Sequence, residues 1–469
     1  MRYGIMLVCI MLFLNREAEQ ARLTALLQSP EGGLAVVTGR RRIGKTRLLV
    51  EWCRTHHGIY AVADQSAPDI QRRYLAEAIA TRLEGFADVE YRDWSALLTR
   101  LARDAARAQW RGPLVFDELP YWVGTSPELP SILQRWLDHD ARAAGLVVVV
   151  AGSSQRMMQG LVLDRQAPLF GRAAALFDVQ PLEWPWIRKA AGRLTPVQTI
   201  EFWSAWGGVP RYWELAVASA DDTRRSIEQL VLDPAGPLHR EPDRLLLEEI
   251  PSALEVRPIL DAVGGGAQRV SEIAARLGRP ATSLSRPIDR LVELGLLVRD
   301  VPFGEPARGT KRSLYRIADP FTRLWFRVVA PHRAQLVSGT SGSRLRLLDR
   351  FWPALNGDGW EQLSRLRVPS CHHPVLGQPG DWLPAQRWWQ GTEPEWDIVA
   401  EHSSERRLLL GEAKIGGRLD RHVAEVASRR APRLPQRFDD YEIVRAVFVP
   451  DAGRVRQEHG VAVVSLAHL

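Results

Sequence analysis

Short apolar runs alternate with helical periodicity along the first 180 residues. The runs are rich in β-branched residues and cover residues 34–38, 61–63, 114–117 and 146–151. Between them, apolar side chains recur at helical spacing over residues 70–110 and 128–144. Such runs are typical of strands buried in a parallel sheet, and the alternation predicts a doubly wound α/β sheet over residues 11–180. In a sheet of this kind, a ligand binds at the carboxyl ends of the strands.

Two further regions follow this sheet. Residues 181–240 are rich in Trp, carry helical signal and are interrupted by Gly207-Gly208-Val209-Pro210, which predicts a helical lid packed on the first domain. Residues 241–325 contain a helix, a turn and a second helix at 281–294, followed by two short strands. This order of elements predicts a winged helix-turn-helix domain.

The sequence that joins the first strand to the first helix matches G-x-x-x-x-G-K-S/T, the phosphate-binding P-loop. Its glycines let successive backbone N–H groups point at one anion, and the N-terminus of the following helix adds a positive dipole end. Lys45 would reach the β- and γ-phosphates, and the Thr46 hydroxyl would ligate Mg²⁺. The predicted ATP-binding residues are Gly39, Arg40, Arg41, Arg42, Ile43, Gly44, Lys45, Thr46 and Arg47.

An apolar strand at 114–117 ends in two acids, as expected of a Walker B element. Asp117 would hold Mg²⁺ together with Thr46, and Glu118 would polarise the attacking water. Lysine usage supports the same interpretation. Of the 62 Lys and Arg residues only four are Lys, at positions 45, 189, 311 and 414. Although nearly every basic residue of the chain is Arg, the P-loop contains a Lys, whose compact ammonium a planar guanidinium cannot replace.

Two later positions have a functional and a structural interpretation each. Ser153 and Ser154 follow the strand at 146–151, where a hydroxyl could sense the γ-phosphate, or could cap the next helix. Arg172 lies in a loop beyond that strand. It could act as an arginine finger or pair with a surface carboxylate, and we favour the catalytic role.

A second group of candidate residues lies in the C-terminal region, residues 326–469. A strand containing Asp397 is followed by a turn and by a second strand that ends in Glu412-Ala413-Lys414. The hairpin would bring Asp397 close to Glu412 and Lys414, and Glu361 on an upstream helix offers a third acid. Two carboxylates can hold Mg²⁺, and a lysine can orient water beside a phosphodiester. The alternative is an ordinary edge hairpin with a surface Glu-x-Lys pair.

The winged helix region carries candidate DNA contacts. The second helix bears Ser283, Ser285, Arg286 and Arg290, and the segment 308–316 reads as a basic wing. The helix would enter a major groove while the wing meets phosphate. A winged helix that serves only as a protein–protein spacer is the alternative.

Composition and charge add few constraints. The net charge of +7 and the pI of about 9.6 permit a nucleic-acid partner without requiring one. Cys9, Cys53 and Cys371 have no pairing or metal spacing, and Cys371-His372-His373 is best read as an ordinary loop, so a cytoplasmic location fits. The apolar stretch 3–14 is shorter than the ~20 residues that span a membrane. We expect the first five or ten residues to be an upstream extension, with translation starting at Met6 or Met11, and residues 11–14 to be a short strand or an apolar lead-in.

Together these motifs resemble the archaeal-type ATPases of the STAND class of P-loop NTPases, which end in a PD-(D/E)xK, restriction-endonuclease-like domain. The resemblance is carried by Phe13–Glu17, Gly39–Thr46, Val115–Glu118, Ala151–Ser154, Pro168–Arg172, Gly207–Pro210, Arg387–Trp389, Glu395–Val399 and Gly411–Lys414. It implies ATP with Mg²⁺, a γ-phosphate role for Arg172 and a place near the adenine for Pro210. The family often has Trp after the last Lys, where this chain has Ile415.

The sequence therefore predicts a P-loop ATPase core, a helical lid, a winged helix and an α/β endonuclease-like domain. The leading function is a Mg²⁺-dependent ATP-hydrolysing switch that acts on DNA, with Asp397, Glu412 and Lys414 as nuclease residues and Asp397 and Glu412 as metal ligands. The alternative is a non-cleaving regulator that grips DNA or a protein while ATP sets its oligomeric state. A homo-oligomer is compatible with both, and no membrane partner is expected.

Overall fold

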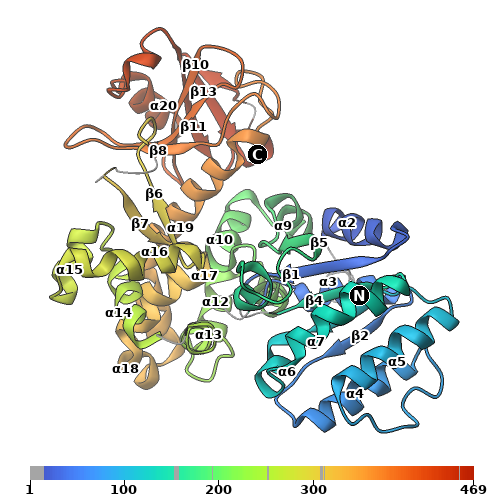
Figure 1. The fold of residues 1–469 in the computed structure, drawn as a ribbon. Helices are drawn as coiled ribbons and strands as arrows, with labels where there is room; N and C mark the ends of the chain where they lie inside the picture. Colours follow the sequence, from blue (N-terminus) through green and yellow to red (C-terminus); the bar gives the residue numbers. More distant parts are fainter. Residues whose placement is uncertain are drawn as a thin grey trace, which may run out of the picture. The chain divides into compact units, whose positions relative to one another are not determined.

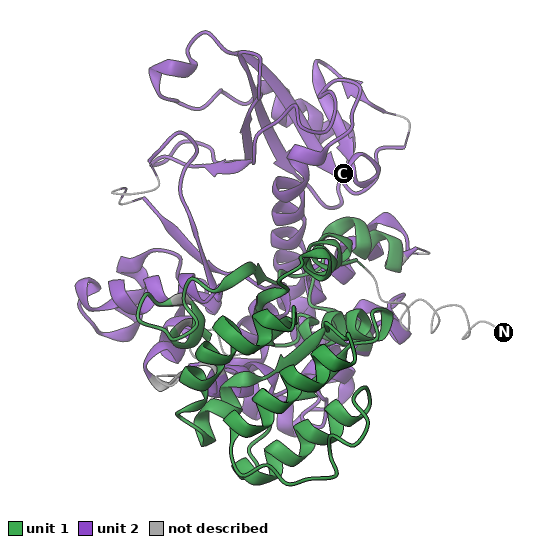
Figure 2. Ribbon diagram, turned by 45° about the vertical axis from the view of Figure 1, so that its right-hand side comes forward, with its two compact units in different colours: residues 1–190, 208–214 green, residues 191–207, 215–469 purple. Residues whose placement is uncertain are grey.

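The computed structural model describes residues 15–152, 158–192, 194–250, 253–306, 310, 312–453 and 455–469. The chain forms two compact units (Figures 1 and 2). Unit 1 contains residues 1–190 and 208–214, and unit 2 contains residues 191–207 and 215–469. The residues predicted to form a helical lid are thus divided between the two units. The four domain boundaries expected from the sequence stay predictions.

Unit 1 is built on a five-stranded parallel sheet with the strand order β2-β3-β4-β1-β5. The strands are β1 (Gly33–Thr38), β2 (Ile59–Val62), β3 (Leu114–Asp117), β4 (Val147–Ala151) and β5 (Ala173–Asp178). The parallel α/β sheet expected from the alternating pattern is therefore confirmed. This strand order places β1, which precedes the P-loop, between the central strand β4 and the edge strand β5.

Helices connect these strands and cover both faces of the sheet. They are α2 (Glu17–Gln28), α3 (Lys45–Thr55), α4 (Pro68–Ala80), α5 (Trp94–Arg107), α6 (Leu119–Thr125) and α7 (Leu129–Trp136). Val36, Phe116 and Val150 share one apolar cluster with residues of α4, α5 and α7. Val115 and Val149 lie outside that cluster and are also fully buried, so both faces are covered, as parallel sheets require.

The first part of unit 2 is helical and includes a winged helix. Its helices are α10 (Pro196–Trp206), α12 (Thr223–Ile227), α13 (Glu241–Glu249), α14 (Ala253–Gly264), α15 (Val270–Leu277), α16 (Ser285–Glu293), α17 (Pro320–Leu324), α18 (Ala330–Ser338) and α19 (Ser341–Arg367). Strands β6 (Leu297–Asp300) and β7 (Leu314–Ile317) pair antiparallel as the wing. The predicted second helix begins one turn later than expected, because residues 281–284 form a 3₁₀ turn before α16.

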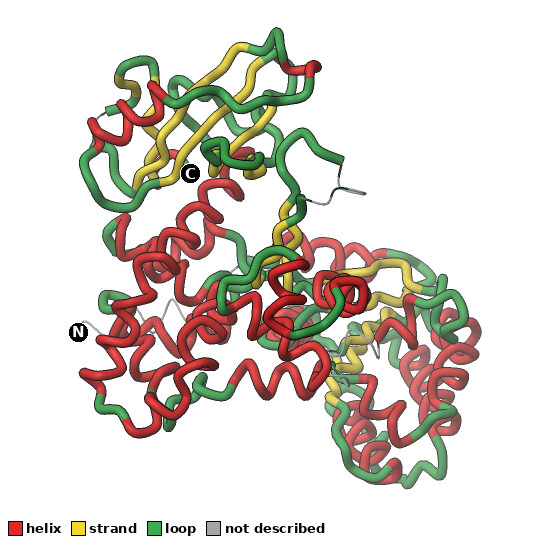
Figure 3. Tube along the Cα trace, turned by 90° about the vertical axis from the view of Figure 1, so that its left-hand side faces the viewer, coloured by secondary structure: helices red, strands yellow, loops and turns green. Residues whose placement is uncertain are grey.

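The C-terminal part of unit 2 is a six-stranded mixed sheet with the order β12-β13-β11-β10-β9-β8. Figure 3 shows strands in yellow close to the C-terminus of the chain. The strands are β8 (Gln386–Trp388), β9 (Trp396–Glu401), β10 (Arg407–Ala413), β11 (Glu442–Val449), β12 (Gln457–Glu458) and β13 (Val461–Ser465). Strands β8, β9 and β10 form an antiparallel meander, and β10 pairs parallel with β11 through α20 (Leu419–Ser428). Helix α19 packs on β9 and β10, whereas α20 packs on β11 and β13.

The long helix α19 also packs closely against α10, and a glycine makes this approach possible. A Cβ atom added to Gly359 would lie 2.1 Å from Ser204 Oγ and 3.0 Å from Ser204 Cα. Gly357, two residues earlier in the same helix, has no heavy atom within 4 Å of such a Cβ. The two glycines therefore differ in packing while sharing the helical backbone.

We expect Gly359→Ala to destabilise the protein by about 1–3 kcal/mol, because the added methyl group overpacks the contact with Ser204. Gly357→Ala is the matched control and should stabilise the protein by up to ~1 kcal/mol through helix propensity alone. Urea unfolding of both variants measures the difference. Equal effects of the two substitutions would contradict this account of the α10–α19 contact.

Candidate functional site

The loop between β1 and α3 has the backbone shape that binding a phosphate requires. Gly39 has a φ of 137° and Gly44 a φ of 95°, values in the region that L side chains rarely adopt. At Gly39 there is also no room for a side chain, because a Cβ would lie 2.7 Å from the carbonyl oxygen of Val179. Helix α3 starts at Lys45, directly after Gly44. Strand, glycine loop and helix follow one another as the sequence predicted.

Lys45 is held inside this loop. Its side chain is 6% exposed, and its ammonium donates to the carbonyl oxygens of Gly39 at 2.7 Å and Arg40 at 3.0 Å. A buried ammonium is costly unless polar groups surround it, so the loop carbonyls keep the charge at the place where an anion would sit. This position agrees with the predicted role of Lys45 as the phosphate-contacting cation.

The P-loop threonine faces the acid at the end of β3. Thr46 Oγ1 donates a hydrogen bond of 2.9 Å to Asp117 Oδ2. Asp117 is 1% exposed, and its other oxygen accepts the backbone N–H of Glu118 at 2.9 Å. A hydroxyl and a carboxylate in contact are the hard oxygen ligands that Mg²⁺ prefers, so this pair fits the predicted metal. Thr46 and Asp117 are the residues that would hold it.

Glu118 adopts an unusual backbone conformation at this edge of the sheet. Its φ of 53° and ψ of 36° are left-handed, and α6 begins at the next residue. Non-glycine residues in this region cost on the order of 1–3 kcal/mol and cluster at functional sites. The strain turns the chain sharply after β3, so that Glu118 follows Asp117 without continuing the strand. This geometry is compatible with the role in activating water that the sequence suggested.

Other predicted nucleotide residues lie close to the loop or have structural partners. A Cβ on Gly44 would lie 3.7 Å from Pro210 Cγ, so Pro210 is beside the P-loop, although its contact with adenine stays a prediction. Arg41 donates to the hydroxyl of Tyr121 at 3.3 Å, and Arg47 pairs with Glu51 at 3.1 Å. Arg42 has a φ of 68° within the turn. Ser153 and Ser154 lie outside the described residues.

Arg172 makes the contact that the alternative interpretation foresaw. Its guanidinium binds Asp138 with two hydrogen bonds of 2.8 and 2.9 Å and also donates to the carbonyl oxygens of Pro168 and Phe170. The bond to Arg172 lowers the pKa of the Asp138 carboxyl. An arginine finger would have to leave this pair, so the γ-phosphate role of Arg172 stays a prediction.

Two residues that the sequence did not single out individually also belong to this site. Arg16 is 4% exposed and donates to the carbonyl oxygens of Ile43 at 3.0 Å and Gln180 at 2.7 Å, which ties the P-loop to the segment after β5. Tyr60 on β2 donates a hydrogen bond of 2.6 Å to Asp117 Oδ2. Arg16 could be noticed only through the family resemblance, and Tyr60 had no sequence signal.

The second group of predicted residues converges at the β9–β10 hairpin. Asp397 Oδ2 accepts the backbone N–H of Ala413 at 3.1 Å, and Lys414 Nζ lies 3.0 Å from Glu412 Oε2. The other Glu412 oxygen pairs with Arg429, which follows α20. The predicted proximity of Asp397, Glu412 and Lys414 is therefore present. Among the described residues, no group of three or more His, Cys, Asp or Glu side chains is arranged to hold a metal ion.

Burial shifts the pKa values of the ionisable residues in this second group. The pKa of Glu412 is raised to about 7 by burial and by the nearby charge of Asp397. Glu361 on α19 has its pKa raised to about 7 for the same two reasons, and Arg365 lies 3.6 Å from it. Burial acts to lower the pKa of Lys414, but Glu412 outweighs burial and the pKa rises. Perturbed carboxyl groups that share a site are typical of functional centres and also of structural ion networks.

One face of helix α16 in the winged helix is exposed, whereas arginines of the wing are paired with acidic side chains. Ile288 and Leu291 of α16 are buried, and Ser283, Ser285 and Arg286 are exposed. Residues 308, 309 and 311 of the predicted basic wing lie outside the described residues. Of the described part, Arg312 pairs with Glu305. Arg316 donates to Asp300 at 2.8 Å within the wing, and the contact of the wing with phosphate stays a prediction.

The loop after β6 joins the wing to the C-terminal sheet. Phe303 is 8% exposed and belongs to the apolar core of that sheet, with its ring centroid 5.3 Å from that of Phe438. Its backbone N–H donates to the carbonyl oxygen of Arg387 at 2.8 Å. A residue next to the wing thus completes the hydrophobic core of the C-terminal sheet. Neither the hydrophobic periodicity nor the composition of the sequence predicted this contact.

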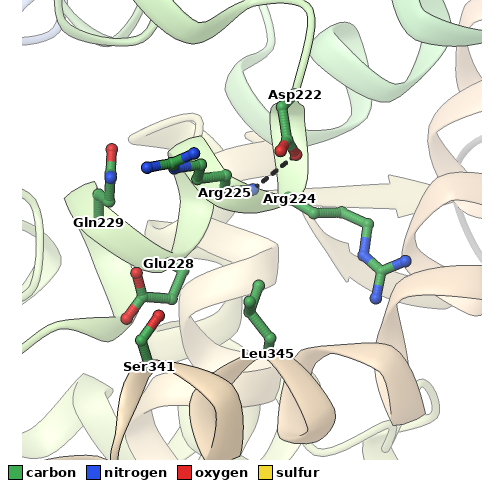
Figure 4. A pocket seen from close by; sticks show the side chains of 7 residues that line it. All are labelled: Asp222, Arg224, Arg225, Glu228, Gln229, Ser341 and Leu345. Atoms are coloured by element: carbon green, nitrogen blue, oxygen red, sulfur yellow. Dashed lines mark hydrogen bonds between the residues drawn. The ribbon is translucent and has the colours of Figure 1, made fainter.

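A polar cavity of about 500 Å³ lies between α12 and the start of α19 (Figure 4). Its lining includes Asp222, Arg224, Glu228 and Ser341. Two of the lining charges are paired, since Glu228 binds Arg344 at 3.1 Å and Arg224 binds Asp349. Asp222 accepts the backbone N–H of Arg225 at 3.0 Å at the start of α12, and we assign no ligand to this cavity.

Comparison with protein families identifies two parts of the chain. Residues 13–215 match a family described as an ATPase domain predominantly from Archaea, and residues 256–313 match the MarR family. The chain therefore carries a P-loop ATPase domain and a MarR-type winged helix, and it is an ATP-hydrolysing enzyme. Neither family model extends into residues 314–469, so the nuclease-like interpretation of the C-terminal domain stays a prediction. None of the described helices is long and apolar enough to cross a membrane.

Similar proteins come from several archaea. The protein of Methanocaldococcus jannaschii named uncharacterized protein MJECL04 is 25% identical over 439 residues, which cover 93% of this chain and 95% of that protein. Among solved structures, the Walker-type ATPase of Pyrococcus abyssi is 19% identical, with a TM-score of 0.49, and covers 67% of this chain and 96% of its own. The ORC2 protein of Aeropyrum pernix is 14% identical, with a TM-score of 0.39, and covers 72% of this chain and 93% of its own.

The raised pKa of Glu361 predicts a pH-dependent stability. With a pKa of about 7 when folded, against the ordinary 4.5, the carboxyl binds more protons in the folded state. Its contribution to stability is complete below the unfolded pKa and is lost as the pH rises through the folded pKa. Glu361→Gln should therefore gain stability relative to the wild type between pH 5 and pH 8, by on the order of 1 kcal/mol.

Urea unfolding at the two pH values measures this change. Glu405→Gln is the control, because Glu405 lies in the exposed turn of the β9–β10 hairpin and its side chain is 58% exposed. Loss of the Arg365 contact affects Glu361→Gln at both pH values, and only the difference between them tests the pKa. A constant offset would mean that Glu361 is ionised throughout this range.

Proposed function

We propose that this chain is a Mg²⁺-dependent ATPase switch that binds double-stranded DNA through its winged helix. The observation that carries the proposal is the contact between Thr46 and Asp117, in the same chain as a MarR-type winged helix with an exposed second helix. The net charge of +7 is favourable for a polyanionic partner. We also propose that the ATPase is of the STAND class, as the motif set suggests.

Different residues of unit 1 would bind the phosphates, hold the metal ion and activate water. The backbone N–H groups of residues 39–46 and the start of α3 would bind the phosphates, and Lys45 would neutralise charge on them. Thr46 and Asp117 would hold Mg²⁺, which supplies charge neutralisation at the phosphate oxygens when bound. Glu118 would orient the attacking water and accept its proton.

The exposed face of α16 supplies the DNA contacts in this proposal. Ile288 and Leu291 anchor the helix to the rest of the winged helix, so its opposite face is rigidly presented. Arg286 can bind a guanine edge or a phosphate, and Ser283 and Ser285 can donate to phosphate. Insertion of a second helix of this kind into the major groove is the usual geometry of helix-turn-helix proteins.

Arg286→Ala should weaken binding to duplex DNA about 5- to 100-fold, which corresponds to the loss of one base or phosphate contact. The control is Arg346→Ala, an exposed arginine of α19 outside the winged helix, which should leave the affinity unchanged. Fluorescence anisotropy with labelled duplex measures both, with ATP, with ADP and without nucleotide. Lys45→Ala should lose ATP turnover, and its DNA affinity should no longer respond to ATP.

The outcomes of this experiment separate two functions. Wild-type binding through several phosphates should weaken steeply as salt increases. If Arg286→Ala and Arg346→Ala bind DNA equally well, the winged helix is not the DNA interface. Binding that ignores salt favours the alternative, a regulator whose partner is a protein.

A nuclease activity of the C-terminal domain is the second proposal, and the hairpin geometry supports it. Asp397 and Glu412 would hold Mg²⁺, and Lys414 would orient a water beside the phosphodiester. Their position at the ends of β9 and β10, beside Glu361 of α19, is compatible with a PD-(D/E)xK site. The ion pair of Glu412 with Arg429 would have to open before Glu412 could bind a metal.

If this proposal is right, the protein should nick supercoiled plasmid in the presence of Mg²⁺. Asp397→Asn and Lys414→Ala should lower the nicking rate at least ~100-fold, because each removes a metal- or water-binding group. Glu405→Gln, in the turn of the same hairpin, should cut like the wild type. A wild-type protein that never nicks DNA with ATP, with ADP or without nucleotide would leave the domain as a binding module only.

A further inference from the structure

The carboxylate of Asp117 is gripped by three donors from three segments of unit 1. Oδ2 accepts the hydroxyls of Thr46 at 2.9 Å and Tyr60 at 2.6 Å, and Oδ1 accepts the backbone N–H of Glu118 at 2.9 Å. Because both oxygens are held, the carboxylate cannot rotate about its Cβ–Cγ bond without losing hydrogen bonds. Thr46 and Glu118 belong to recognised motif positions, whereas Tyr60 belongs to neither motif.

The bond from Tyr60 has the features of a strong hydrogen bond. Its length of 2.6 Å lies in the range of charge-assisted O–H···O⁻ bonds, which are roughly twice as strong as neutral ones. Asp117 is 1% exposed, so water does not compete for the carboxylate. A tyrosine phenol is protonated at neutral pH and therefore donates this bond to the carboxylate.

The sheet explains why this tyrosine can reach the acid. Strand β2 lies beside β3, and the two run parallel in a register that opposes Tyr60 to Val115 and Val62 to Asp117. Val62 is therefore the residue of β2 that lies beside Asp117, and Tyr60 precedes Val62 by two positions. A long side chain such as that of tyrosine is needed to reach the carboxylate from there. A Phe at this position would keep the ring and lose only the donor.

We infer that Tyr60 is a positioning residue of the ATPase site, which holds the Asp117 carboxylate towards Thr46 and thereby sets the magnesium requirement of nucleotide binding. The inference rests on the proposed role of Thr46 and Asp117 as magnesium-holding residues. Tyr60 itself acts on Asp117 and needs no contact with the nucleotide. Without its hydroxyl, Oδ2 retains the Thr46 donor, and the carboxylate gains freedom to turn away from the metal position.

Tyr60→Phe should therefore raise the Mg²⁺ concentration that half-maximally tightens the binding of a non-hydrolysable ATP analogue, by about 10- to 150-fold, the range expected for a hydrogen bond to a charged group. Isothermal titration of the full chain with the analogue at a series of Mg²⁺ concentrations measures this shift. Affinity for the analogue without Mg²⁺ should stay the same. In steady-state assays kcat should fall at low Mg²⁺ and recover at high Mg²⁺, while KM for ATP changes little at saturating Mg²⁺.

The control is Tyr91→Phe, the same change at a tyrosine of unit 1 whose hydroxyl donates to the carbonyl oxygen of Phe86 at 2.7 Å. This variant should keep the wild-type Mg²⁺ dependence. Asp117→Asn separates the inference from the proposed function. If Asp117→Asn abolishes the Mg²⁺ dependence while Tyr60→Phe matches the wild type or binds Mg²⁺ more tightly, only the role of Tyr60 is wrong. If Asp117→Asn also leaves the dependence unchanged, the proposed magnesium site is wrong.

Discussion

The hydrogen bond between Thr46 and Asp117 joins two segments that are 71 residues apart in the sequence. It exists because β1 and β3 run parallel on either side of β4, so the loops after both strands open at the same edge of the sheet. The buried valines of β4 hold these strands in register. The nucleotide site therefore depends on the core: a shift of β3 by one residue would turn the acid away from the P-loop.

Much of this site could be predicted because its parts are local. The glycine loop with the start of the helix after it is one short stretch of sequence, and the apolar strand that ends in two acids is another, so each motif can be recognised by itself. Tyr60 could not be predicted in this way. Its importance comes from one hydroxyl that reaches from β2 to the neighbouring strand β3. Neither the hydrophobic periodicity nor the spacing of motifs indicates which side chains meet between two parallel strands.

The C-terminal domain illustrates the same limit. The strands around Asp397 and Glu412 were expected from short apolar runs, and their antiparallel pairing follows from the short turn between them. Arg429 was not expected beside Glu412, because it follows α20 and the end of that helix has no motif. Ion pairs that close a polar site depend on tertiary packing. For this reason the sequence predicted that the acids lie close together but did not predict the cation that pairs with one of them.

Phe303 shows that the winged helix and the C-terminal sheet are interleaved along the chain. The Phe303 ring lies in the core of the C-terminal sheet, although Phe303 precedes β8, the first strand of that sheet, by more than 80 residues. Helices α17, α18 and α19 lie between them in the sequence. During synthesis the wing leaves the ribosome well before the strands that cover this ring exist. Until they arrive, the nascent chain carries an exposed aromatic side chain, and the winged helix reaches its final form only when the last domain has folded.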